Sequence, residues 1–169
     1  MIDATIGGST SNSYVTLAFA NAYMTSRTGA LAWDELDDST KEAHLLTATR
    51  QIEVAQWSGV KLHRTTQNLQ WPRTGLYDFD SNIILNIPKQ LINAQMELVY
   101  WQLTEGDRLL SDTDLQQVGS LSAGPLNITA IKGPSFFPAL VIQMLQAIGP
   151  GILMKTPGAP ITQSVRFVI

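Results

Sequence analysis

The chain has 169 residues, of which 44% are hydrophobic and 15% charged, and its formal net charge is −3. This length suits one domain with a real core, or one domain with an arm, and the lack of cysteine excludes disulfides, zinc fingers and a cysteine nucleophile. A free soluble domain carries about a quarter charged residues, so the low charge content suggests that a partner covers part of the surface.

Apolar periodicity predicts two helices in the first third of the chain. Residues 1–13 are polar and glycine-rich, and we expect them to form a flexible lead. A first helix is predicted over residues 17–27 and a second over residues 39–57, because apolar side chains recur there at helical spacing. Ser39 and Glu42, three residues apart, have the pattern of a capping box at the start of the second helix.

The middle of the chain combines a long irregular stretch with a third helix. Residues 58–87 show no clear periodicity, and their length indicates a functional loop or a compact Ω-like loop. Pro88 suits the first turn of a helix, where its missing N–H costs nothing, and an apolar stripe then continues to about residue 105.

The last third contains more breaks. Partial alternation over residues 117–132 predicts a short β-ribbon, and residues 137–148 read as a fourth helix. A Pro/Gly hinge follows over residues 149–160. Residues 161–169 are apolar and β-prone, which fits either a core strand or a strand donated to a neighbour.

These elements predict a mainly α protein: a small bundle of about four helices with a short β-ribbon and extended N- and C-terminal arms. We divide it into the lead, residues 1–13, a helical domain over residues 14–148, and a C-terminal arm over residues 149–169. Since the longest apolar run, residues 137–154, is broken by prolines and glycines, we expect no membrane span.

The residues that could carry catalysis or metal binding do not form a recognisable site. His44 and His63 lack the spacing of a metal motif, and a packing or surface role is the simpler interpretation. The acidic residues at positions 34–38 are explained by the positive end of the following helix. Asp78 and Asp80 lack the further ligands of a calcium loop. We therefore predict no enzyme activity, no cofactor and no metal.

Residues 54–77 contain no acidic side chain. The same stretch contains four basic or titratable side chains and two tryptophans: Lys61, His63, Arg64, Arg73, Trp57 and Trp71. Such a set could bind single-stranded nucleic acid by stacking and charge, or it could contact an acidic protein. In the third interpretation the loop is solvated and its tryptophans pack back on the core.

Several short motifs together resemble a known family. The most specific is Leu-Gln-Trp-Pro-Arg-Thr-Gly at residues 69–75, and less specific pieces lie at residues 11–15, 41–49, 87–103 and 118–126. Over roughly residues 9–148 the chain resembles a family of tailed-phage proteins labelled as DnaT-like single-stranded DNA-binding proteins. By gene role and fold, that family looks like the head–tail connectors, or adaptors, of tailed phages.

The resemblance implies a structural virion protein that assembles in the host cytoplasm and sits in the phage neck. Its copies would form a ring, commonly of twelve, between the portal protein and a tail or nozzle protein. Genomic double-stranded DNA would pass through without specific binding. The side chains expected at these protein interfaces are Trp71, Arg73, Lys61, Arg64, Val165, Arg166, Phe167, Val168 and Ile169.

The family label also supports an alternative, a single-stranded DNA-binding or replication accessory protein. Lys61, Arg64, Arg73 and Trp71 would then carry the binding, with a steep salt dependence. The negative net charge argues against this alternative, because contacts with phosphates supply most of the affinity of such proteins.

Overall fold

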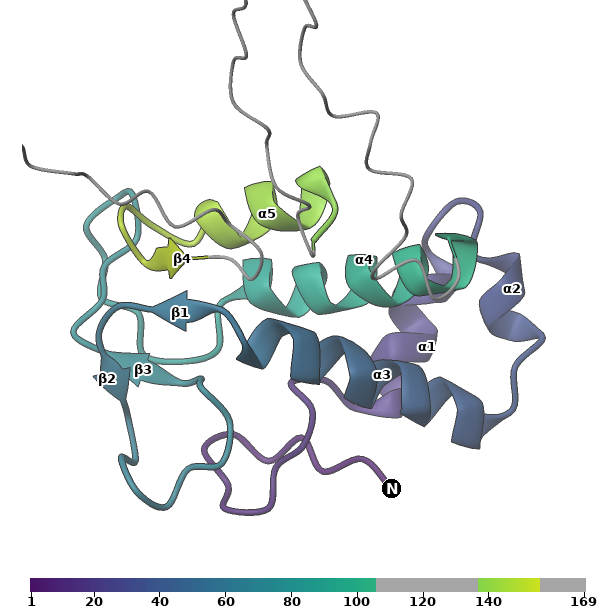
Figure 1. Cartoon of the computed structure of the whole chain (residues 1–169), viewed down its shortest axis with the longest axis horizontal. Helices are drawn as coiled ribbons and strands as arrows, with labels where there is room; N and C mark the ends of the chain where they lie inside the picture. The colour runs from purple at the N-terminus through teal and green to yellow at the C-terminus, as the bar shows by residue number, and fades with distance from the viewer. Residues whose placement is uncertain (106–136, 156–169) are drawn as a thin grey trace, which may run out of the picture.

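The computed structural model describes residues 1–105 and 137–155, and Figure 1 shows a helical body with a small strand region at one end. The predicted mainly α fold class is confirmed. The helices are α1 (Leu17–Thr25), α2 (Leu31–Asp34), α3 (Asp38–Glu53), α4 (Lys89–Glu105) and α5 (Ala139–Gln146). The strands are β1 (Gln56–Trp57), β2 (Val60–Lys61), β3 (Arg73–Thr74) and β4 (Leu153–Lys155).

Helix α4 is the centre of the bundle and lies between α3 and α5 (Figure 1). Its side chains from Ala94 to Val99 are all buried, since neighbouring helices cover it on more than one side. Such a helix needs apolar residues beyond a single stripe. From α5, Val141 and Leu145 complete this packing, and both are fully buried.

The second predicted helix begins at a different cap from the one expected. The side chain of Asp37 accepts a hydrogen bond from the backbone N–H of Thr40 at 2.8 Å, so Asp37 is the N-cap residue of α3. Ser39 lies inside the first turn, and its hydroxyl donates to the Asp37 carboxylate. The capping-box prediction is therefore wrong, although an acidic residue does stabilise this helix end.

Two antiparallel strand pairs form what we call the strand end of the molecule, together with the loops that join them. In the first pair β1 joins β4, so residues 153–155 return to the end of α3. In the second, Val60 of β2 is opposite Thr74 and Lys61 is opposite Arg73. Gly59, at φ +70°, makes the tight turn from β1 to β2, a backbone conformation that favours glycine.

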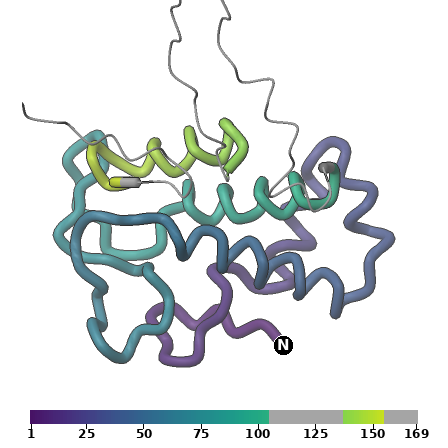
Figure 2. The backbone as a smooth tube through the Cα atoms, viewed as in Figure 1, coloured from purple at the N-terminus to yellow at the C-terminus, as the bar shows by residue number. Residues whose placement is uncertain are grey.

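Residues 1–13 form a closed loop rather than an extended lead. The backbone N–H of Asp3 donates to the Asn12 side chain, and the N–H of Asn12 donates to the Asp3 carbonyl, both at 2.8 Å. Ser13 beyond them is buried. Figure 2 shows this loop at the N-terminus beside the loop that joins β2 to β3. The predicted β-ribbon at residues 117–132 lies outside the described residues.

An ion pair ties α1 to the central helix. The Arg27 guanidinium donates to both carboxylate oxygens of Glu97, at 2.8 and 2.7 Å, and stacks over the ring of Tyr100. The Tyr23 hydroxyl donates to the same carboxylate at 3.0 Å. Hydrogen bonds from Arg27 hold the pKa of Glu97 below its ordinary value, while burial raises the pKa of Tyr23 to about 12.

We predict that Glu97 makes the stability of the protein sensitive to acid. Because its folded pKa is lowered, its contribution is present above the ordinary value of 4.5 and is lost as the pH falls through the folded pKa. Glu97→Gln should reduce the free energy of unfolding by about 1–3 kcal/mol at pH 7. Urea unfolding should show this deficit shrinking as the pH falls below 4.5.

Glu35→Gln provides the matched control, since Glu35 is exposed at the end of α2. Its free energy of unfolding should stay within about 0.5 kcal/mol of the unmodified protein. A Glu97→Gln deficit that does not change with pH would contradict the assignment.

Candidate nucleic-acid interface at the strand end

The most specific sequence motif, residues 69–75, is part of the scaffold. The Arg73 side chain is buried and donates to the backbone carbonyls of Ser58 and Gly59, each at 2.7 Å. It also donates to the Trp57 carbonyl at 3.3 Å and to the carbonyl and side-chain oxygens of Gln70 at 3.2 and 2.9 Å. One guanidinium therefore fastens the turn between β1 and β2 to the segment before β3.

Trp71 is buried in the same region, with an exposed fraction of 1%. Its ring meets the ring of Trp57 edge to face, with centroids 5.5 Å apart and an interplanar angle of 81°. Since neither side chain reaches the surface, the structure supports the third interpretation of the tryptophans, in which they pack on the core. We had expected Trp71 and Arg73 to contact a partner. Both side chains are instead buried in the strand end and do not face a partner.

Glu53, at the end of α3, supports the same scaffold from the other side. Its carboxylate accepts the backbone N–H of Gln70, at 3.0 Å to each oxygen, and the hydroxyl of Tyr14. Burial raises the pKa of Glu53, and the nearby charges of Lys61 and Arg73 oppose that rise. Burial lowers the pKa of Arg73, while the Coulombic effect of Glu53 opposes that fall. The Glu53 carboxylate is therefore held inside the strand end by hydrogen bonds from Tyr14 and Gln70.

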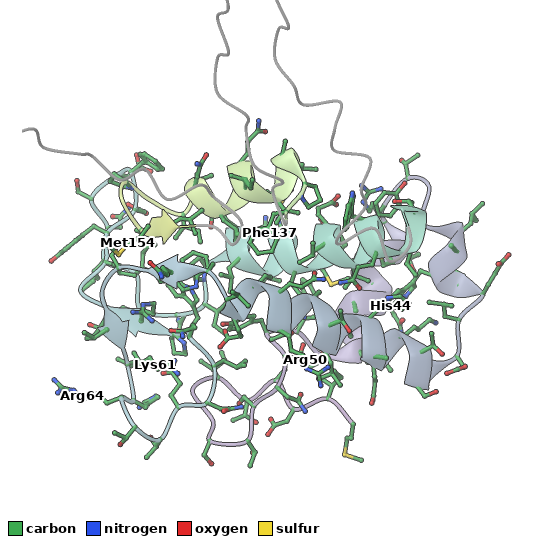
Figure 3. All side chains as sticks on the ribbon, in the orientation of Figure 1. His44, Arg50, Lys61, Arg64, Phe137 and Met154 are labelled. Carbon is green, nitrogen blue, oxygen red and sulfur yellow. The ribbon has the colours of Figure 1, made fainter. Side chains whose placement is uncertain are left out.

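Four basic or titratable side chains remain at the surface here, and we call them the basic edge: Arg50, Lys61, His63 and Arg64. Arg50 is exposed in the last turn of α3, and His63 and Arg64 are exposed in the loop after β2. The Lys61 ammonium is partly covered and donates to the carbonyls of Gln67 and Asn68, at 3.3 and 2.9 Å. Figure 3 shows Arg64 at the left end of the view, Lys61 next to it in the strand end, and Arg50 farther right, between α3 and the N-terminal loop.

The loop that presents His63 and Arg64 is held by the buried side chain of Gln67. The Gln67 amide donates to the carbonyls of Leu69 and Pro72, at 2.8 and 3.0 Å, and its oxygen accepts the backbone N–H of His63. The N-terminal loop packs against it, because the backbone N–H of Asn68 donates to the Gly8 carbonyl at 3.1 Å. The loop is therefore preorganised and need not be ordered by a ligand.

Gly7 determines where the imidazole of His63 lies. A Cβ at Gly7 would overlap the His63 ring, and Gly7 has φ +69°, which favours glycine. The ring is consequently packed against the backbone of the N-terminal loop, while His63 remains exposed overall. Sequence reasoning could not find this contact, because the two residues are far apart in the chain.

The remaining candidate residues have structural partners or lie outside the described part. His44 is hydrogen-bonded to Gln102 at 3.1 Å, which fits a packing role. Asp78 organises a turn, accepting the backbone N–H groups of Asp80 and Asn82 at 2.9 and 2.8 Å. The interface residues predicted in the C-terminal tail, Val165 to Ile169, lie outside the described residues.

The described residues contain neither a candidate metal site nor a candidate membrane-spanning helix. Within residues 1–105 and 137–155, no group of three histidine, aspartate or glutamate side chains is placed to hold a metal ion. No helix in those ranges is long and apolar enough to cross a membrane.

Arg50 is a candidate site residue that the sequence did not indicate, because it lies in a helix outside the acid-free stretch of residues 54–77.

We predict that Arg73 contributes to stability. Arg73→Lys keeps the charge but cannot reach the carbonyls of Trp57, Ser58 and Gly59 together, and should lower the free energy of unfolding by about 2–3 kcal/mol. Arg64→Lys, at an exposed position, should stay within about 0.5 kcal/mol. Urea denaturation measures both, and equal effects would contradict a structural role for the Arg73 side chain.

Comparison with known proteins identifies the family. A family model described as "Putative DnaT-like ssDNA binding protein" matches residues 1–139. No curated protein and no solved structure matches the chain. The head–tail connector expected from the resemblance, with its ring, portal and tail partners and passive double-stranded DNA, is wrong, because the matching family is described by single-stranded DNA binding. The chain belongs to the family that is described as "Putative DnaT-like ssDNA binding protein".

Proposed function

We propose that this protein binds single-stranded DNA, as a binding protein rather than an enzyme, and that the basic edge is the contact surface. The observation that carries the proposal is the family match over residues 1–139. The choice of the basic edge is supported by its exposed cations and by its preorganised loop.

The distribution of charge answers the objection raised by the net charge of −3. Four acidic residues lie at positions 34–38, around α2 and the start of α3, whereas Arg50 lies in the last turn of α3. Residues 54–77 contain no acidic side chain, and the nearby Glu53 carboxylate is occupied by Tyr14 and Gln70. The basic edge can therefore attract phosphates although the whole chain is negative.

Asp3 is the acidic residue of the neighbouring N-terminal loop. Its carboxylate accepts the backbone N–H of Thr5 and the hydroxyl of Thr10, at 2.9 and 2.7 Å, and these bonds lower its pKa. Asp3 thus stays ionised and weakens the local attraction for phosphates. We expect a moderate, salt-sensitive affinity as a result.

Contacts with bases would come from small surfaces rather than from the tryptophans. The imidazole of His63 is fixed against Gly7, and Leu62 and Ile6 are exposed by 41% and 57%. Stacking on the His63 ring tolerates any base, because every base has a π-face, and Leu62 and Ile6 offer apolar contact without hydrogen bonds. We therefore expect binding with little sequence preference.

We predict that reversing two charges of the basic edge weakens binding. The double variant Arg50→Glu/Arg64→Glu should bind an oligothymidine at least about tenfold more weakly at low salt, because two phosphate contacts become repulsive. The slope of log affinity against log salt should fall by roughly 1.4, at about 0.7 per phosphate contact on a single strand. Fluorescence anisotropy over a salt series measures both quantities.

Lys41→Glu is the control for local charge, since Lys41 lies near the start of α3, beside the ring of Trp33. It should leave the affinity within about twofold, because exposed charges beyond a Debye length of ~10 Å are largely screened. An equal loss of affinity in Lys41→Glu would show that the basic edge is not the contact surface. Absence of binding by the unmodified protein at low salt would overturn the function itself.

A further inference from the structure

A second surface of the strand end is apolar, and we call it the hairpin patch: Tyr77, Phe79, Ile83 and Leu85. Their exposed fractions are 55%, 65%, 52% and 59%, and all four lie within nine residues of the chain. Met154 of β4 adds a further apolar side chain that is 68% exposed. Concentrated exposure of this kind marks an interaction surface rather than ordinary scatter.

The hairpin patch rests on a well-defined turn. Tyr77 and Ile83 form an antiparallel bridge, and the backbone N–H of Asp78 donates to the Asn82 carbonyl at 2.9 Å. The Asp78 carboxylate accepts the N–H groups of Asp80 and Asn82 and the Asn82 side-chain amide, and these hydrogen bonds lower its pKa. The apolar side chains are therefore presented by a closed turn, which lowers the entropy lost when a partner binds.

The hairpin patch lies next to the segment that leads into β4, the last described strand. Gly149 packs so closely on the backbone of Tyr77 and Asp78 that a Cβ would overlap the Tyr77 carbonyl oxygen. From Gly149 the chain turns through Ile152 into β4, which ends at Lys155. Figure 3 shows Met154 at this end of the molecule. Residues 156–169 thus continue from β4, whose last residue pairs with Gln56 of β1, six residues after the Gly149 contact with the hairpin.

The chemistry of residues 161–169 complements the hairpin patch. Their sequence, Ile-Thr-Gln-Ser-Val-Arg-Phe-Val-Ile, is apolar with Arg166 as its one charged side chain. Residues 75–88 contain two charged side chains, Asp78 and Asp80, and both are acidic. We propose that residues 161–169 of the same chain bind over the hairpin patch, with Arg166 beside Asp80.

Chain length favours binding within one molecule. The five residues between Lys155 and Ile161 can span roughly 17 Å at about 3.4 Å per residue. A short linker gives an effective concentration in the millimolar range, so the tail of the same chain outcompetes a second copy in dilute solution. This proposal does not depend on single-stranded DNA binding, because it concerns a different surface.

The test places a nitroxide spin label on the tail of the full-length protein. The chain has no cysteine, so Ser164→Cys provides a single attachment site. In nuclear magnetic resonance spectra, the amides of residues 76–85 should lose most of their intensity when the label is paramagnetic. The amides of α2 should keep theirs. No loss at residues 76–85 would overturn the proposal.

Two sets of variants separate specific docking from chance proximity. Phe79→Asp should restore the lost intensity, whereas Leu31→Asp, at another exposed apolar position, on α2, should not. Asp80→Arg and Arg166→Asp should each restore part of the intensity, and combining them should bring the loss back. A combined variant that behaves like the two single variants would overturn the Asp80–Arg166 contact.

A mixing experiment tests whether the contact is within one chain. Isotope-labelled protein without the nitroxide is mixed with unlabelled protein that carries it. The amides of residues 76–85 should then keep their intensity, because the tail of one molecule does not reach another. An intensity loss in this mixture would show that a second copy supplies the tail and would overturn the proposal.

Discussion

The strand end depends on one buried cation. The Arg73 guanidinium donates to the carbonyls of three successive residues, Trp57 to Gly59, and to two oxygens of Gln70. Buried carbonyl groups without a partner are costly, and four two- or three-residue strands make few hydrogen bonds of their own. A charged donor with a planar fork satisfies several carbonyls at once, which explains why arginine is better suited than lysine at this position.

The loop of the basic edge and the hairpin patch are both attached to the strand end. The loop with His63 and Arg64 leaves β2 and returns to β3, and the hairpin patch begins at Tyr77, three residues after β3 ends at Thr74. The two surfaces nevertheless differ in chemistry, since the first has exposed cations and no acidic side chain, whereas the second is apolar with Asp78 and Asp80. A phosphate-bearing ligand favours the first surface and is repelled by the second.

Helical periodicity was enough to predict the body of the fold. The stripes in residues 17–27, 39–57 and 88–105 correspond to α1, α3 and α4, because burial against neighbouring helices requires that spacing. Helix α2 has four residues, which is too short for any periodicity to be detected. The site was harder to predict, because nothing in the sequence distinguishes the buried Arg73 from the exposed Arg64. Arg73 is buried because it lies where Trp71 packs on Trp57 and where several backbone carbonyls accept its hydrogen bonds, and this arrangement is seen only in the structure.

The net charge of −3, which argued against single-stranded DNA binding, does not describe the charge around the basic edge. Net charge sums the whole chain, but a ligand responds to the charges within about a Debye length of it, ~10 Å in moderate salt. Here the acidic residues at positions 34–38 lie towards the start of α3 and Arg50 lies in its last turn. At 1.5 Å per residue, the 12 residue steps from Asp38 to Arg50 span roughly 18 Å of helix, so the two groups are screened from each other. A protein with a negative net charge can therefore present a basic edge to DNA. The local charge of the contact surface, not the net charge of the protein, decides whether phosphates are attracted.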